Sequence, residues 1–311
     1  MADAVPTVPP PAARSDGTPA APTVAAGSVA AVVVNYNAAP HLVACVQSLV
    51  DEGAGPIVVV DNASVDASRE VLAGSGLPAR FLPAGRNLGY GAGANLGTGV
   101  TESELVLVCN ADVVLMPGVV TALSQALEED PRRAIAGPRI EDMEGRLYPS
   151  ARTFPALGDA VGHAFLGMIA PGNRWSTRYK MLGWDHATRT EVDWVSGACF
   201  LARRDALGQL GGFDESYFMY SEDVDLCWRA WKAGWKVVYE PAGTIRHVQG
   251  ASTDHHPYRM IAEHHRALLR FAYRSNPGWR RLLLPVVAAG LGVRTLMAWA
   301  QRLGEQYRTR H

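Results

Sequence analysis

The chain of 311 residues is long enough for one large domain or two smaller ones with a sizeable core. It is 48% hydrophobic and 19% charged, which is typical of a globular protein and not of a disordered one. The formal net charge of −1 excludes a global field that would attract nucleic acid, so we expect no nucleic-acid partner. Any attraction to a phosphate must be local.

The N-terminal stretch and the cysteines indicate the compartment. Residues 1–28 are rich in Ala and Pro and lack the apolar core of a signal peptide, so we expect a disordered leader. The four cysteines form no C-x-x-C pair and have apolar neighbours, which favours buried, reduced thiols: Cys45, Cys109, Cys199 and Cys227. Reduced thiols suit a cytoplasmic protein.

Apolar runs that end in polar residues alternate with helical patterns in the first half of the chain. Val29–Val34 predicts a strand buried on both faces, and Leu42, Cys45, Val46 and Leu49 then share one helix face. Similar runs predict strands within 56–64, 79–87, 105–112 and 134–140, and a helix over 117–130. This alternation predicts the α/β class, with an open, doubly wound, mostly parallel sheet.

Polar residues follow four successive predicted strands. They are Asn35 and Asn37, Asp61 and Asn62, Asn87, and Asn110 and Asp112. Each alone is better explained as a turn or N-cap residue. Because ligands of such sheets bind beyond the carboxyl ends of the strands, four ends that carry Asn or Asp favour a binding crevice.

The segment NLGYGAGANLG, residues 87–97, resembles a dinucleotide-binding loop only superficially. It follows the third predicted strand instead of the first, and its glycines do not match G-x-G-x-x-G. We therefore expect a glycine-lined helix start, where backbone approaches a ligand, and no nicotinamide or flavin site.

The second half is less regular. Residues 191–207 predict a strand that leads into a short helix, 211–220 a loop, and 221–233 a helix with Ser221 as N-cap and Gly234 after its end. Separate strands are expected at 236–241 and 244–248, and a long helix at 257–274.

Three carboxylates lie in the first turn of the helix at 221–233. Val224, Cys227, Trp228 and Trp231 form its predicted buried stripe, which leaves Glu222 and Asp225 on the exposed side. Asp225 pairs with Arg229 at i, i+4, and acids in a first turn usually complement the helix dipole. Asp223 lies at the border of the stripe. A partly sheltered, ionised carboxylate there would suit a general base.

Six segments in this order resemble glycosyltransferase family 2, whose members are inverting enzymes with the GT-A fold. They are VVNYN, VVDNAS, RNLGYGAGAN, CNAD, GGFDESYFMYSEDVDLCWRAWKAGW and the histidine at 247. The resemblance covers residues 29–252, with a nucleotide-binding half at 29–150 and an acceptor half at 151–252. Within the family, YPSAR, WVSGACFLARR and HVQGAST resemble actinobacterial enzymes that transfer L-rhamnose from dTDP-rhamnose to GlcNAc-diphospho-polyprenol.

The resemblance implies roles for individual residues. Asp61 would bind the pyrimidine base, and the remaining nucleotide contacts would come from Asn35, Tyr36, Asn37, Asn87, Gly89, Asn95 and Asn110. Asp223 would be the catalytic base. The acceptor side would include Trp194, Tyr220, Glu222 and Arg229, with Tyr217 and Phe218 as further aromatic wall; core packing explains these aromatics equally well.

One position departs from the family pattern, because Asn110 replaces the first Asp of the D-x-D motif. Asp112, His247 and the donor diphosphate would then hold the divalent metal, Mg or Mn, with Mn the softer fit to a histidine. The alternative is a weaker metal dependence, with Arg or Lys sharing the diphosphate charge. The other open alternative is a different donor, such as a UDP-hexose or a galactofuranosyl nucleotide.

The C-terminal residues 253–311 predict helices. The apolar run Leu282–Val293 is shorter than the ~18 residues that a membrane span needs, and Trp279, Arg280, Arg281, Arg294 and Arg302 flank it. Such a segment suits either the interface of a membrane or packing on its own domain. A peripheral position at the inner face of the plasma membrane would bring the enzyme to a polyprenyl-linked acceptor.

Overall fold

The structure, a computed structural model, describes residues 29–154, 181, 183–248 and 257–309. The predicted leader at 1–28 therefore lies outside the described residues. A ten-stranded sheet forms the centre, with the order β3-β2-β1-β4-β11-β6-β12-β5, while β7 pairs with β6 and β9 with β12. Its strands are β1 Val29–Asn35, β2 Ile57–Asp61, β3 Ala79–Pro83, β4 Leu105–Asn110, β5 Val113–Leu115, β6 Arg133–Glu141, β7 Leu147–Tyr148, β9 Thr190–Glu191, β11 Cys199–Arg203 and β12 Lys236–His247.

The direction of the strands agrees with the predicted mostly parallel sheet. β1, β2, β3, β4, β6 and β12 run one way, and β5, β7, β9 and β11 run the other way. The reversed β11 lies between β4 and β6. Because β11 is antiparallel, the residues that precede it lie at the carboxyl ends of the parallel strands.

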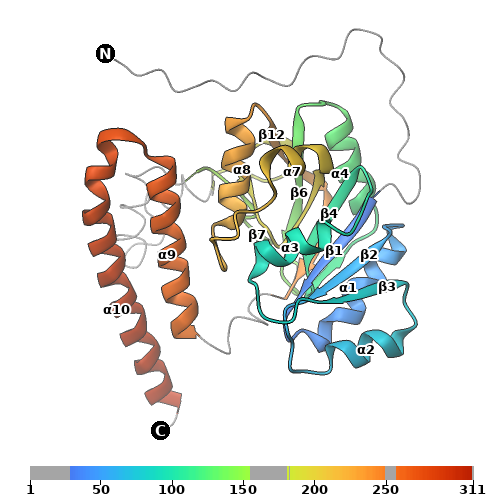
Figure 1. Ribbon diagram of the computed structural model, residues 1–311, viewed down its shortest axis with the longest axis horizontal. Coiled ribbons are helices and arrows are strands. Elements are labelled where there is room, and N and C mark those ends of the chain that lie inside the picture. The colour runs from blue at the N-terminus through green and yellow to red at the C-terminus, as the bar shows by residue number, and fades with distance from the viewer. Residues whose placement is uncertain (1–28, 155–180, 182, 249–256, 310–311) are drawn as a thin grey trace.

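Helices cover both faces of the sheet, as a doubly wound fold requires (Figure 1). One face carries α1 Ala39–Asp51, α2 Ser68–Ser75 and α4 Val119–Glu128, and the other carries α3 Tyr90–Thr98, α7 Arg204–Leu210 and α8 Glu222–Lys232. A separate two-stranded sheet pairs β8 Ala151–Arg152 with β10 Trp194–Val195.

The sheet separates two hydrophobic cores. Along β1, Val29, Ala31 and Val33 face one core while Val32 and Val34 face the other, since strand side chains alternate between faces. This explains the uninterrupted apolar run that predicted the strand. The four residues of the predicted α1 face and all four cysteines are buried as expected.

Glycine allows α3 to lie close to its neighbours. A Cβ at Gly97 would come within 2.3 Å of Val32 Cγ1, so the helix backbone rests directly on β1. At Gly89, where φ is +87°, a Cβ would lie 2.0 Å from the carbonyl oxygen of Phe218. The expectation of a backbone that approaches a ligand was therefore incomplete, because these glycines accommodate close contacts within the protein.

Two elements differ from the sequence prediction. The strands expected at 236–241 and 244–248 form one strand, β12, whose register with β6 shifts between Glu240 and Thr244. The short strand β5 was not predicted. It starts directly after Asp112 and pairs with the end of β12, which brings Val113 opposite His247.

The C-terminal residues form a helical hairpin of α9 Pro257–Ser275, the 3-10 helix η1 Gly278–Leu283 and α10 Leu284–Thr309. α9 lies between α8 and α10, and α10 is the outermost layer (Figure 1). Phe271 of α9 is buried against Trp228 and Phe154, with ring centroids 6.2 and 6.4 Å apart. No helix in the described part of the chain has both the length and the apolar character that crossing a bilayer needs.

Candidate active site

The ends of β1 and β2 form one hydrogen-bonded unit. Asn35 and Asp61 are register partners, and the Asn35 side-chain amide donates to Asp61 Oδ1 at 2.8 Å and to Ser64 Oγ at 3.1 Å. The backbone N–H of Ser64 donates to Asp61 Oδ2 at 3.1 Å. Because both carboxylate oxygens accept a bond, the Asp61 side chain is fixed in place before any ligand arrives.

The other strand-end residues extend this unit. The backbone N–H of Asn37 donates to Ser64 Oγ at 2.9 Å, and its side-chain oxygen accepts from the N–H of Val65 at 2.8 Å. Asn62 donates to the carbonyl oxygen of Gly89 at 3.0 Å, while Asn87 accepts the N–H of Gly89. The predicted convergence of the β1, β2 and β3 ends is thus present in the fold.

Beyond β4, Asp112 and His247 face each other. Asp112 Oδ1 lies 3.2 Å from His247 Nε2, and the Asn110 amide lies 3.3 Å from the same nitrogen. The backbone N–H of Val248 donates to the Asp112 carbonyl oxygen at 3.1 Å, which holds the end of β12 against this turn. The D-x-D-like segment and the histidine, 135 positions apart, therefore form one cluster.

This cluster fits a divalent ion that takes most of its ligands from elsewhere. Two ligand atoms that each lie about 2.1 Å from a Mg or Mn ion, at right angles to each other, are about 3 Å apart. Asp112 Oδ1 and His247 Nε2 are separated by a similar distance. Within the described residues, no group of three or more His, Cys, Asp or Glu could hold a metal. Phosphate oxygens and water would have to complete the coordination.

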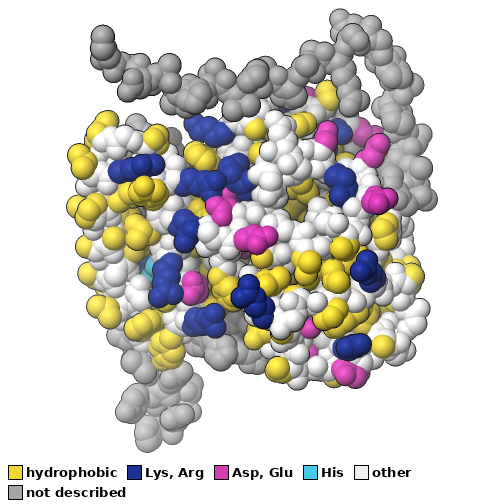
Figure 2. Space-filling view, viewed as in Figure 1, with side chains coloured by type: hydrophobic (Ala, Val, Ile, Leu, Met, Phe, Trp, Pro, Cys, Tyr) yellow, Lys and Arg dark blue, Asp and Glu magenta, His cyan; other side chains and the backbone are white. Residues whose placement is uncertain are grey.

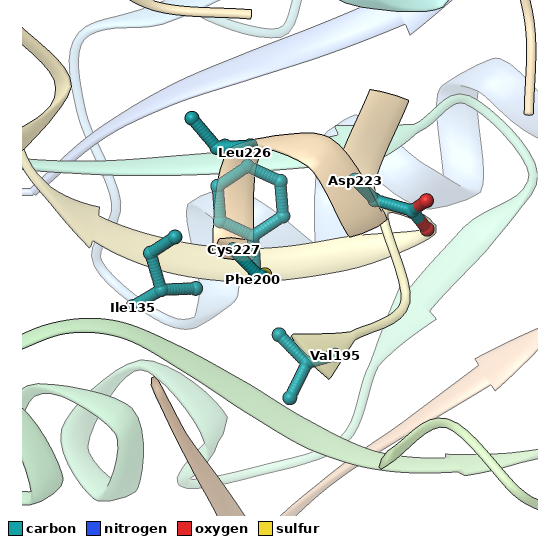
Figure 3. Close-up of a pocket in the computed structure, with 6 residues that line it drawn as sticks. All are labelled: Ile135, Val195, Phe200, Asp223, Leu226 and Cys227. Atoms are coloured by element: carbon teal, nitrogen blue, oxygen red, sulfur yellow. The ribbon is translucent and has the colours of Figure 1, made fainter. Parts of the chain in front are cut away.

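Asp223 is held at the start of α8 by backbone donors. The N–H of Gly197 donates to its Oδ2 at 2.9 Å and the N–H of Val224 to its Oδ1 at 2.8 Å. Tyr90 donates its hydroxyl to the carbonyl oxygen of Gly197, which ties α3 to the same turn. Behind Asp223 is a small apolar cavity lined by Ile135, Val195, Phe200, Leu226 and Cys227 (Figure 3). The Asp223 carboxylate points away from these five side chains.

Glu222 and Asp223 form a coupled pair of carboxyls. Burial raises the pKa of Glu222 to about 8, and the charge of Asp223 acts in the same direction. Burial also raises the pKa of Asp223, although the N–H groups of Gly197 and Val224 act to lower it. Because these donors favour the charge on Asp223, the proton that the pair retains near neutral pH is assigned to Glu222.

The prediction that Glu222 and Asp225 lie on the exposed side of their helix was wrong. Glu222 is 6% exposed and Asp225 is fully buried, whereas Trp228 and Trp231 of the predicted stripe are only half-buried. For Asp225 the cause is α9, which packs on this side of α8 through Phe271 and Arg274. The predicted pair of Asp225 and Arg229 is present at 2.7 Å, and Arg274 of α9 lies 3.3 Å from the other oxygen of Asp225.

The loop before α8 has an unusual backbone. Tyr220 and Ser221 both have positive φ, +70° and +59°, a conformation that costs of order 1 kcal/mol or more for a residue other than glycine. Ser221 occupies the predicted N-cap position, but its side chain makes no capping bond. The loop is held from outside, since the N–H of Tyr90 donates to the Phe218 carbonyl at 3.1 Å and the Tyr220 ring packs 5.0 Å from that of His264.

Several other residues predicted for the site bond to backbone atoms of the protein and so support neighbouring segments. Asn95 exchanges two hydrogen bonds with the backbone of Phe213 and so anchors the start of the loop. Trp194 is buried, and its indole N–H donates to the Thr153 carbonyl at 3.0 Å. Arg229 donates to the Leu210 carbonyl as well as to Asp225. Tyr36 and Tyr220 are half-buried.

Sequence reasoning missed three residues that organise the site: Ser64, Tyr90 and Gly197. Ser64 belongs to the segment VVDNAS that the sequence analysis singled out, so a signal for it was present. Tyr90 and Gly197 are 107 positions apart, and no local pattern shows that they meet. Arg152 was also left without a role; its guanidinium lies 5.4 Å from the Tyr148 ring and 5.2 Å from the Trp194 ring.

All these groups lie along one edge of the sheet. Asp61, Asn35 and Asn110 end neighbouring parallel strands, and the Asn110 N–H donates to the Ala198 carbonyl at 3.0 Å, next to the residue that holds Asp223. A doubly wound, mostly parallel sheet whose strand ends bring Asn, Asp and His side chains together has the architecture of the GT-A fold of glycosyltransferases.

Comparisons with known proteins agree with this class. Glucosyl-3-phosphoglycerate synthase from Mycobacterium tuberculosis, solved with Mg2+ and uridine diphosphate, matches with a TM-score of 0.55 at 17% identity, over 83% of each chain. A mannosyltransferase from Pyrobaculum calidifontis, solved with GDP-Man and Mn2+, matches with a TM-score of 0.55 at 13% identity, over 88% of this chain and 75% of that one. At these identities the likeness shows the shared fold.

The sequence comparisons identify the family. Residues 26–266 match the family described as Glycosyltransferase like family 2. N-acetylglucosaminyl-diphospho-decaprenol L-rhamnosyltransferase of Mycobacterium tuberculosis is 39% identical over 263 residues, which cover 80% of this chain and 85% of that protein. The chain belongs to glycosyltransferase family 2, and it is a hexosyltransferase.

Proposed function

We propose that the protein transfers L-rhamnose from dTDP-rhamnose to a GlcNAc-diphospho-polyprenol, with inversion at the anomeric carbon, in the synthesis of a cell-wall linker. The observation that carries the choice of substrates is the 39% identity to the mycobacterial rhamnosyltransferase over most of both chains. Residues 29–252 would form the transferase domain, with donor contacts from 29–150 and acceptor contacts from 151–252.

The donor nucleotide would bind at the ends of β1 and β2. Asp61 is held with one oxygen toward Asn35 and the other toward Ser64, so it presents a fixed acceptor to the N–H of a pyrimidine base. Asn35 Oδ1 is buried and has no hydrogen-bond partner among the described residues, which leaves an acceptor for a ligand donor. Tyr36, Asn37, Asn87 and Gly89 would complete the pocket, and Asn95 would act through the loop that it anchors.

The diphosphate would lie at Asp112 and His247, with Asn110 toward the ribose or the sugar. A divalent ion bound by these residues, Mg or Mn, would supply Lewis-acid neutralisation of the charge that develops on the leaving diphosphate. The unpaired Nδ1 of His247 is buried and, within the described residues, has no partner. The short distance between Asp112 and His247 supports this assignment more directly than the motif does, because the motif lacks its first Asp.

Asp223 would remove the proton of the attacking acceptor hydroxyl. A general base must be ionised, and the N–H groups of Gly197 and Val224 stabilise its charge despite burial. Attack on the face opposite the leaving diphosphate in one displacement converts a β-L-rhamnosyl nucleotide into an α-L-rhamnoside. Trp194, Tyr220, Glu222 and Arg229 would act on the acceptor side, Arg229 indirectly through Asp225.

A donor screen tests this proposal. Thermal shifts with Mn and a set of nucleotide sugars should be largest for dTDP-rhamnose, and transfer to a synthetic GlcNAc-diphospho-lipid should give a product with one added deoxyhexose and an α linkage. UDP-glucose is the matched control donor. Transfer from UDP-hexoses alone would overturn the rhamnose assignment and leave the reaction class standing.

Metal chelation tests the role of Asp112 and His247. EDTA should abolish transfer, and added Mn or Mg should restore it. If the rate in EDTA equals the rate with metal, Asp112 and His247 are not metal ligands, and basic side chains must neutralise the diphosphate instead.

A further inference from the structure

The outer side of the C-terminal hairpin exposes a row of apolar side chains. Leu282, Val286, Ala289, Val293 and Leu296 recur at alternating steps of four and three residues, which places them on one face of a helix. Leu282 is 79% exposed and Val286 is 68% exposed. Trp279, which is 70% exposed, lies in the same hairpin just before this row. Large apolar side chains rarely gather on a surface without a partner.

The opposite side of α10 is already used within the protein. Leu284 and Leu291 are buried, Thr295 bonds to His265 of α9 at 2.6 Å, and the indole of Trp299 donates to the Tyr258 carbonyl at 3.2 Å. Packing on α9 therefore explains one face of the helix and leaves the row unexplained. Figure 2 shows hydrophobic side chains along the outer edge of the hairpin, with Lys and Arg side chains nearby.

The charge of the hairpin is opposite to that of the rest of the chain. Residues 257–311 contain ten arginines and two glutamates, a formal charge of +8. Since the whole chain has a charge of −1, residues 1–256 carry −9. A basic segment with a Trp and an apolar face has the composition of a membrane-interface element, and anionic lipid head groups attract it.

We propose that the exposed row of η1 and α10 is a docking surface for an anionic lipid bilayer, with the apolar side chains in the interface and the exposed Arg281 beside the row on the head groups. A second copy of the chain fits less well, because pairing two rows would bring two hairpins of +8 together. The proposal deepens the proposed function, since a polyprenyl-linked acceptor lies in such a bilayer, but vesicle binding can be measured without any transfer.

The same hairpin contacts the loop that leads to Asp223. From α9, Arg259 lies 5.0 Å from the Phe218 ring, Arg270 lies 5.6 Å from the Tyr217 ring, and His264 packs on Tyr220. The two helices α10 and α9, each about 10 Å across, therefore lie between the docking surface and the acceptor side of the site. Docking would hold the acceptor side close to the bilayer that carries the lipid substrate.

The test is flotation of the full chain with vesicles of phosphatidylcholine, with and without phosphatidylglycerol. The wild type should float with the anionic vesicles and release at high salt. The double variant Val286→Glu/Leu296→Glu should bind at least about tenfold more weakly. Met143→Glu is the matched control, because Met143 is also exposed but lies between β6 and β7.

Two further measurements separate the possible outcomes. The double variant should keep the melting temperature of the wild type and its rate with a short-chain, water-soluble acceptor, which shows that it is folded. Equal vesicle binding of the double variant and the wild type, or equal binding to neutral and anionic vesicles, would overturn the proposal. A wild-type dimer that the double variant converts to a monomer would assign the row to a second copy instead. If the wild type does not transfer the sugar to the soluble acceptor, that result contradicts the proposed function. It leaves the docking proposal unaffected.

Discussion

The donor side and the base side of the site are built in different ways. At the donor side, Asn35 and Asp61 end adjacent parallel strands, Ser64 follows the second strand, and the three bond to one another over 2.8 to 3.1 Å. At the base side, Asp223 depends on Gly197 and on a loop that has two residues of positive φ and packs on α9 through Tyr220. The difference teaches that regular sheet geometry holds the residues proposed to bind the nucleotide, whereas contacts between distant segments hold the proposed base.

The replacement Asp223→Asn should have the largest effect. It removes the proton acceptor and keeps the shape of the side chain, so kcat should fall at least ~100-fold while donor binding changes little. Steady-state kinetics and a thermal shift with the donor nucleotide measure the two quantities. Asp205→Asn, at an exposed position of α7, is the control. Turnover close to that of the wild type would show that another group takes the proton.

The replacement Gly89→Ala should disrupt the junction between the two sides. The added Cβ would meet the Phe218 carbonyl oxygen, so the free energy of unfolding should fall by at least ~2 kcal/mol. Gly53→Ala is the matched control, because Gly53 has a φ of +72° but open space around its Cβ position. Urea unfolding compares the two variants. Equal losses would mean that the positive φ matters and the contact does not.

The replacement Asp61→Asn should affect the donor side alone. Loss of a charged acceptor for the base should raise the donor KM about tenfold with kcat nearly unchanged, since hydrogen bonds to charged groups contribute about 1.5–3 kcal/mol. Asp66→Asn is the control, because the Asp66 carboxylate bonds to Ala39 and Ser68 within the protein. A fall in kcat without a change in KM would contradict the division between the two sides.

The smallest effect concerns the pH dependence of stability through Glu222. Its pKa is about 8 in the folded chain and near 4.5 in the unfolded chain, so the folded state binds the proton more tightly. The stability that this contributes is fully present below about pH 4.5 and is lost as the pH rises to about 8.

Glu222→Gln removes this ionisation. Between those two pH values the melting temperature of the wild type should fall more than that of the variant, because only the wild type has a carboxyl that releases this proton on unfolding. Thermal unfolding of both proteins across the range measures the difference. If the melting temperatures of the two proteins change with pH by the same amount, Glu222 gains no proton on folding.

The donor side could be predicted from the sequence because each contributing signal is local. An apolar run followed by Asn or Asp marks a strand end, and parallel strands bring their ends together without further information. The base side could be predicted only in part. The sequence singled out Asp223 as a candidate base, but a helical wheel of α8 does not include α9, so it placed Asp225 away from the buried stripe although that carboxylate is fully buried.

The direction of β11 was also beyond the sequence signals. An apolar run in a buried sheet reads the same in both directions, and only pairing with Val108 and Ile135 shows that it is reversed. This reversal brings Gly197 to the working edge, where its N–H reaches Asp223. Gly197 contributes a backbone N–H, which every residue except proline has, so side-chain composition gives no signal for it in the sequence.

The two positive φ values of Tyr220 and Ser221 have a consequence for engineering. Glycine at position 220 would relieve the strain, but it would also give the unfolded chain more conformational freedom, which opposes the gain in stability. It would also remove the ring that rests on His264 and loosen the turn that aims Asp223. The strained backbone at this position is therefore balanced by the ring contact with His264, and a substitution that relieves the strain gives up that contact.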